Sequence, residues 1–121
     1  MGTIASSYRD TMLDALPATQ YLALFVGDPA GAGTECSGTG YARIAVTMAA
    51  ASGGSRANSS GPHVFTVGAG GWQAGVNYGA LYSASSGGSL ISSDALDATR
   101  DMSVVGATMT FGAGDVVESN T

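Results

Sequence analysis

The chain opens with apolar residues that repeat at every fourth position. The residues at this spacing are Ile4, Tyr8, Met12 and Leu16. Such a spacing places the apolar side chains on one face of a helix. Pro17 follows directly and cannot continue a helix, because it lacks the backbone N–H. The pattern predicts one helix over about residues 4–16.

From residue 21 onward the apolar pattern changes to that of strands. Tyr21–Val26 is a continuous apolar run of strand length, and it predicts a strand buried on both faces. Four further segments alternate between apolar and polar residues with a period of two, as half-buried strands do. These segments are 41–48, 63–67, 76–82 and 107–111.

Glycine-rich stretches separate the predicted strands. They lie at 31–40, 52–61, 68–71, 83–89 and 112–114, and the chain has 19 glycines in total. Many short strands joined by glycine-rich turns are typical of antiparallel sandwiches and jelly rolls. We therefore predict one domain, 1–121, with an antiparallel β-sandwich or jelly-roll-like fold over about 21–118 behind the helix.

The charge composition is low and excludes one class of partner. Charged residues make up 11% of the chain, against roughly 25% in an average soluble domain. Either other subunits cover much of the surface, or the surface is neutral and rich in Gly, Ser and Thr. The chain has no lysine, four arginines and a net charge of −5. Nucleic-acid binding needs a cluster of basic groups, so no nucleic-acid partner is predicted.

The sequence lacks the usual signals for membranes, disulfides and cofactors. It has no apolar run long enough to span a bilayer and no secretory leader pattern, so synthesis in the cytoplasm is expected. Cys36 is the single cysteine, which excludes a disulfide within the chain. The glycine-rich segments 31–33 and 68–71 do not complete a phosphate-binding fingerprint and predict hairpin turns instead. No cofactor is predicted.

We find no sequence pattern for catalysis. His63 is the single histidine, and no Gly-x-Ser-x-Gly nucleophile motif accompanies it. Asp94, Asp97 and Asp101 form the densest acidic stretch, which predicts a solvated loop; a structural Ca²⁺ is the weaker interpretation of the same three carboxylates. Acids in one loop make a poor pair across a cleft, so the chain is not predicted to be an enzyme.

Aromatic and basic residues are the candidates for contacts with partners. Trp72 lies among glycines, with Tyr78 and Tyr82 downstream; these aromatics could stack on sugars, anchor a subunit interface or fill the core. Arg43 stands on the polar side of a predicted strand and is the preferred interfacial charge. Tyr8 and Met12 belong to the helix, which could dock on a neighbouring subunit or cover its own sandwich.

A set of motifs resembles one kind of viral protein. Between Gly27 and Ser59 the set comprises the turn Gly27-Asp28-Pro29, a turn at Glu35 and Gly38, Tyr41-Ala42-Arg43, the strand Ile44–Met48 and a small-residue loop ending at Asn58. Looser similarity continues through 78–82, 87–91 and 114–115. The chain resembles the small virion structural proteins of tailed bacteriophages, which are often labelled tail-fibre, minor tail or head-decoration proteins.

This resemblance implies a structural component of the virion. Its expected partners are copies of itself and other virion proteins, such as major capsid or tail proteins, and its expected place is the capsid or the tail. The alternative is a tail-tip module that binds host-surface glycans through Trp72, Tyr78, Tyr82 and the acidic loop that holds Asp94, Asp97 and Asp101. Sandwich folds host both kinds of function, so fold alone does not separate the two hypotheses.

Overall fold

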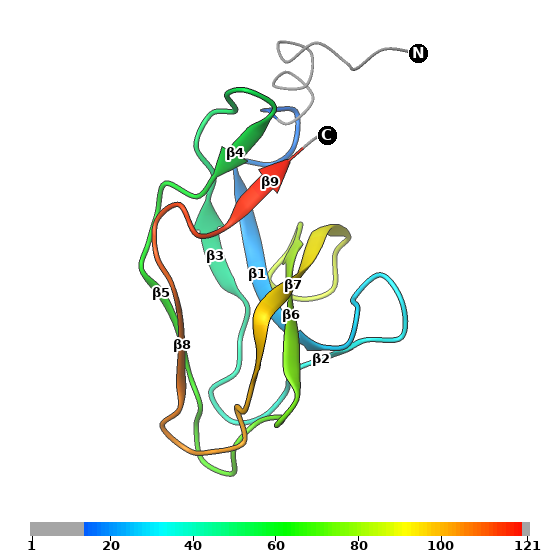
Figure 1. The fold of residues 1–121 in the computed structure, drawn as a ribbon, viewed down its shortest axis with the longest axis vertical. Coiled ribbons are helices and arrows are strands. Elements are labelled where there is room, and N and C mark those ends of the chain that lie inside the picture. Colours follow the sequence, from blue (N-terminus) through cyan, green and yellow to red (C-terminus); the bar gives the residue numbers. More distant parts are fainter. Residues whose placement is uncertain (1–13, 120–121) are drawn as a thin grey trace.

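The computed structural model describes residues 14–119, and across this range the chain is built from antiparallel strands (Figure 1). The strands are β1 (Thr19–Val26), β2 (Thr34–Glu35), β3 (Ile44–Thr47), β4 (Ser55–Ala57), β5 (His63–Thr66), β6 (Val76–Tyr82), β7 (Leu90–Arg100), β8 (Thr108–Phe111) and β9 (Val117–Ser119). The prediction of a mainly β, antiparallel fold is confirmed.

Strand β1 lies in the middle of a five-stranded sheet. One edge of β1 pairs with β6, which in turn pairs with β7. The other edge pairs with β3 over Thr19–Leu22 and with β2 at Phe25 and Val26. Strand β7 therefore forms one edge of this sheet, and β2 and β3 share the other.

Two separate ribbons complete the architecture. Strand β5 pairs with β8, and β4 pairs with β9. Figure 1 shows the β5–β8 ribbon running alongside the sheet, while β4 and β9 lie at the end of the molecule where the chain enters β1. Side chains from β5 and β8 pack with those of β1 and β6 in one apolar cluster, so the ribbon covers one face of the sheet. This arrangement is compatible with the predicted β-sandwich.

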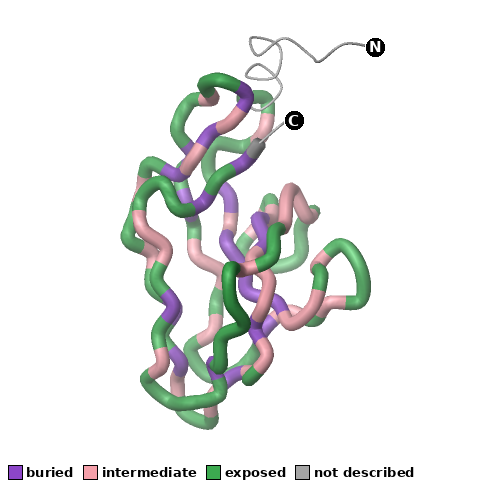
Figure 2. Tube along the Cα trace, in the orientation of Figure 1, coloured by how far each residue is buried: buried purple, intermediate pink, exposed green. Residues whose placement is uncertain are grey.

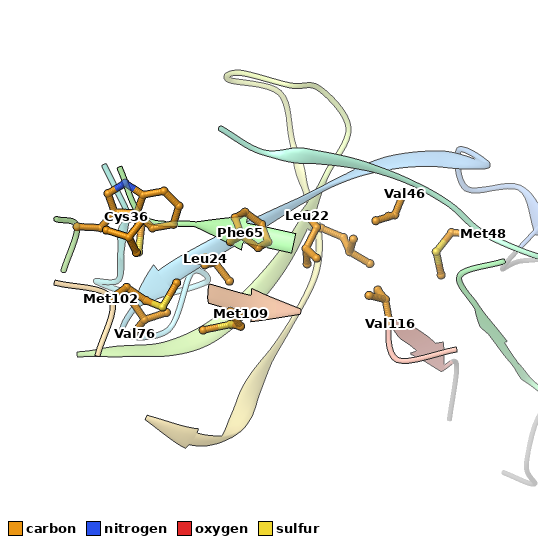
Figure 3. Close-up of a cluster of buried hydrophobic side chains, with 13 residues drawn as sticks. Leu22, Leu24, Cys36, Val46, Met48, Phe65, Val76, Met102, Met109 and Val116 are labelled. Atoms are coloured by element: carbon orange, nitrogen blue, oxygen red, sulfur yellow. The ribbon is translucent and has the colours of Figure 1, made fainter. Parts of the chain in front are cut away.

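The apolar run of β1 is buried on both faces, as its sequence predicts. Leu22 and Leu24 point into the main core, while Ala23 and Phe25 belong to a second cluster on the other face of the sheet. Figure 3 shows the main core as a long row of side chains, with Cys36 and Met102 at one end and Met48 and Val116 at the other.

Three predictions need correction. The helix predicted over about 4–16 falls outside the described residues except for 14–16, and the structure does not support it. The acidic stretch is not simply a loop, because Asp94 and Asp97 belong to β7, which pairs with β6 at the edge of the sheet and is largely exposed at these positions (Figure 2). Asp101 lies just after this strand. The glycine-rich stretch 52–61 is not purely a turn, since β4 forms within it.

Candidate functional site

Arg43 lies at the centre of a polar cluster on the β2–β3 edge of the sheet. Its Nε donates a hydrogen bond to Oε2 of Glu35 at 2.9 Å, and its Nη2 donates to Oε1 of Glu35 at 2.9 Å. Glu35 ends β2 and Arg43 directly precedes β3, so the common pairing of both strands with β1 brings them together. Two parallel charge-assisted bonds are the strongest way in which an arginine binds a carboxylate.

The rest of the Arg43 guanidinium holds the loop between β6 and β7. Its Nη1 donates to the carbonyl oxygens of Ala84 at 3.0 Å and Gly87 at 2.8 Å. Its Cζ lies 3.9 Å from the ring centroid of Tyr82, a cation–π contact. The Arg43 side chain is only 8% exposed. Within the chain Arg43 therefore connects three segments, and its role at an interface stays a prediction.

Tyr41 belongs to the same polar cluster as Arg43 and Glu35. Its hydroxyl donates to Oε2 of Glu35 at 2.7 Å and accepts a bond from the Leu24 amide at 3.1 Å. Burial raises the pKa of Tyr41 well above its ordinary value, and the nearby Glu35 charge raises it further. Burial also acts to raise the pKa of Glu35, but the hydrogen bonds from Arg43 and Tyr41 outweigh it and hold that pKa below its ordinary value.

The lowered pKa of Glu35 predicts acid sensitivity. A carboxyl whose pKa is lower in the folded chain adds stability above its ordinary pKa of 4.5, and loses it as pH falls through the folded value. We expect Glu35→Gln to lower the free energy of unfolding by about 1–2 kcal/mol at pH 7, a modest value because solvent reaches part of the pair. Urea unfolding should show this difference shrinking below pH 4.5. Asp97→Asn, at an exposed position of β7, is the matched control; a difference that grows in acid would contradict the assignment.

Trp72 is buried in the main core rather than displayed in a loop. It is 7% exposed, and its Nε1 donates to the carbonyl oxygen of Thr39 at 2.8 Å. The indole meets the rings of Tyr41 and Phe65 edge-on, at centroid distances of 5.2 and 6.5 Å. Gly38 permits this approach, because a Cβ there would lie 2.6 Å from the indole ring. The buried indole offers no face on which a sugar could stack.

Tyr78 and Tyr82 lie on the opposite face of the sheet from Trp72. Both are half-buried against the second cluster, and the Tyr82 ring stacks on Phe25 at 5.9 Å. The three predicted aromatic candidates therefore do not form one surface. Tyr8 and Met12 lie outside the described residues.

The acidic candidates do not come together as a metal site. Asp94 and Asp97 lie in β7 and Asp101 follows it, where its carboxylate caps the backbone of Ser103. Within residues 14–119, no group of three or more Asp, Glu, His or Cys side chains is arranged to hold an ion. His63 begins β5, and its Nε2 lies 2.9 Å from Oγ of Ser60, which accepts the Thr47 amide. This contact bridges two strands.

Cys36 follows Glu35 in the sequence and is buried beside the polar cluster of Arg43, Glu35 and Tyr41. Burial first, and the Glu35 charge second, raise the pKa of its thiol to about 11. The thiolate is the reactive form of cysteine. We therefore expect the native protein to resist a thiol reagent at pH 8, and the urea-unfolded protein to react rapidly. A native thiol labelled at the unfolded rate would contradict this burial.

A buried ion pair joins β4 to β9. The sequence patterns did not indicate this ion pair. Nε of Arg56 donates to Oε1 of Glu118 at 2.9 Å, and both side chains are 3% exposed. Nε2 of Gln20, in β1, donates to the same oxygen at 3.2 Å. Arg56 and Gln20 each also donate to the carbonyl oxygen of Pro17, where the chain enters β1. The partners stand 62 and 98 positions apart, so no local pattern indicates them.

An open groove separates the β7 edge from β8 and β9. Its volume is about 860 Å³, and its walls include Asp94 and Leu96 of β7, Phe111 of β8 and Val117 of β9. A groove of this size lies in the range of ligand-binding pockets, although it is open on one side.

Comparison with known proteins gives one match. The family model described as podophage GP4 fiber I protein gp80 matches residues 4–118. No curated protein and no solved structure matches the chain. No helix among the described residues is long and apolar enough to cross a membrane. Because the match extends over nearly the whole chain, the chain belongs to the podophage GP4 fiber I protein gp80 family, a family of structural proteins of the tailed-phage virion.

Proposed function

We propose that this protein is a non-enzymatic fibre subunit of a tailed-phage virion, which acts through contacts with copies of itself and with other virion proteins. The observation that carries the proposal is the family match over residues 4–118. The name of the family refers to a fibre, which favours a place in a fibre over decoration of the capsid. The low charge of the chain adds support, since charged residues are depleted at the core of protein interfaces.

The described residues also supply surfaces suited to assembly. Strand β7 is a long, exposed sheet edge, and unpaired edges readily accept another strand. Val104 and Val105 are exposed in the loop that follows β7. By contrast, Arg43, Glu35 and Trp72 are less suited to contacts between subunits. Their side chains already form hydrogen bonds within the chain.

Host-surface glycans are the alternative partner. Of the three predicted aromatic candidates, Trp72 is buried, so Tyr78 and Tyr82 remain for contact with a sugar. The Tyr82 ring already contacts Arg43 and Phe25. If sugars bind on this face, Tyr78→Ala should reduce attachment of the purified protein to host cells. The same change should leave the incorporation of the protein into virions unchanged.

Labelling of intact virions tests the proposal. Antibodies raised against the purified protein and carrying gold should bind along the fibres in electron micrographs. Label on the capsid shell would favour the decoration role. Virions without label would contradict the proposal that the protein is part of the virion. Virions that lack the protein supply the control for antibody specificity.

A further inference from the structure

The face of the five-stranded sheet that lies opposite the main core has no second layer in the described part of the chain. A small cluster forms the centre of this face, and its members are Ala23, Phe25, Tyr78, Ala80, Tyr82 and Leu90. All of them come from β1, β6 and β7, whereas the β5–β8 ribbon packs on the other face. Ala23, Phe25 and Ala80 are already buried, so a partner would meet the residues around them.

Tyrosine and alanine are the accessible residues on this face. An antiparallel sheet face that meets water usually carries polar residues. Here the strand register places Tyr21 beside Tyr82, with Ala45 of β3 beyond Tyr21 and Ala95 of β7 beside Tyr78. The three tyrosines are half-buried and the two alanines are exposed, so all five can contact a partner. We call these five residues the tyrosine face.

The tyrosine face offers no charge to a partner. None of the residues that pair on this face in β1, β3, β6 and β7 is charged. At its β2–β3 edge, Glu35 and Arg43 already bind each other. Asp94 of β7 pairs with Gly79, which belongs to the main-core side of the sheet. A partner that relies on complementary charges would find none here.

We propose that two copies of the chain pack against each other through their tyrosine faces, as the two sheets of a sandwich do. Copies with a net charge of −5 repel each other, and the repulsion is weakest where neither presents a charge. In a two-fold contact the same patch lies on both partners, so each group must be compatible with its own kind. Tyrosine meets this requirement, because its hydroxyl both donates and accepts hydrogen bonds. The inference rests on the proposed function, since it names a contact by which fibre subunits associate.

Two other occupants fit the tyrosine face less well. Residues 1–13 of the same chain bring one basic and one acidic side chain, which would gain no partner on this face. Leu16, which follows them, lines the groove on the main-core side of the sheet. A sugar needs an aromatic ring that is free for stacking, but the Tyr82 ring already contacts Phe25 and Arg43.

Matched alanine variants test the surface. Ala45→Asp and Ala95→Asp each place a charge at an exposed position of the tyrosine face, whereas Ala113→Asp places the same charge in the exposed loop between β8 and β9. Sedimentation of the full chain should show a dimer that either face variant weakens about tenfold or more and that Ala113→Asp leaves unchanged. Circular dichroism verifies that the variants fold. Equal effects of all three variants, or a full chain that stays monomeric, would overturn the proposal.

Dityrosine cross-linking of the unmodified chain identifies the occupant. Heavy-isotope-labelled and unlabelled chains are mixed and photo-oxidised with a ruthenium complex and persulfate, which joins tyrosine rings that lie close together. Mass spectrometry should find links between a labelled and an unlabelled chain that join Tyr21, Tyr78 or Tyr82. Links through Tyr8 instead would overturn the proposal in favour of residues 1–13. The absence of any link between chains would overturn it in favour of a different partner.

These outcomes are separable from the test of function. Gold label on the fibres, combined with a chain that stays monomeric and forms no links between copies, would overturn the assignment of the tyrosine face alone. A dimer joined through the tyrosine face, combined with virions that carry no label, would support this assignment and reject the fibre role.

Discussion

Trp72→Ala is expected to cost about 3–5 kcal/mol of unfolding free energy, the usual range for removing a buried tryptophan. The indole fills the space between Tyr41 and Phe65, and the change would also remove the shorter of two hydrogen bonds to the Thr39 carbonyl, which keeps only the bond from the Gly68 amide. Domains of this size are commonly stable by only about 5–15 kcal/mol, so the variant should be close to unfolding. Urea titration followed by circular dichroism measures the loss.

Two further variants test whether the loss arises from packing. Trp72→Phe keeps a ring but cannot donate to Thr39, so it should fall between the wild type and Trp72→Ala. Val105→Ala, at an exposed site, should change the free energy of unfolding by less than about 0.5 kcal/mol. A Trp72→Ala protein as stable as the wild type would show that the indole is not a core element.

Much of the fold could be predicted from local sequence periodicity. The five predicted strand segments all overlap observed strands, and 76–82 coincides with β6. The continuous apolar run 21–26 predicts burial on both faces, because a strand that is covered on both faces has no face that needs polar side chains. The predicted resemblance to virion proteins of tailed phages is confirmed by the family match.

The missed elements lack such a local signal. Strand β7 carries Ser, Asp, Thr and Arg because it is an edge strand, and edge strands tolerate charged residues that protect them from unwanted pairing. Strands β4 and β9 are three residues each and exist through pairing with each other across 62 positions of the chain. Periodicity over so few residues cannot indicate them.

The contact candidates show the same limit. Trp72 sits among glycines, which in sequence suggests an exposed loop. In the folded chain Gly71 instead allows the close approach of the Ser103 backbone, where a Cβ would clash. Gly38, distant in sequence, allows the indole itself to approach for the same reason. Arg43 was selected as a polar strand residue, but its bonds to Glu35, Ala84 and Gly87 depend on loops that only the tertiary structure brings near.

These contacts suggest how a chain with few charges uses them to hold its fold. Of the three arginines in the described range, Arg43 and Arg56 are nearly buried and paired within the chain. The paired internal charges hold the sheet edge and the β4–β9 ribbon in place. The position of Arg56 at the entry to β1 makes it the strongest test of this role.

Removing one member of the buried pair is expected to be as damaging as removing the tryptophan. Arg56→Met should cost about 3–5 kcal/mol, because it leaves the Glu118 carboxylate buried without its cation. Gln20 would still donate to Oε1 of Glu118, but its amide is neutral, and Oε2 already lacks a partner. Urea unfolding at pH 7 measures the effect, and Arg100→Met, on exposed β7, is the control that removes an equal charge.

The double variant Arg56→Met with Glu118→Leu separates the charge from the packing. Apolar side chains of similar volume can replace a buried ion pair at little or no cost, because neither charge then has to leave water. We expect the double variant to recover most of the stability lost by Arg56→Met alone. Additive losses would show instead that Arg56 stabilises the fold mainly through its bond to the Pro17 carbonyl, which neither apolar side chain replaces.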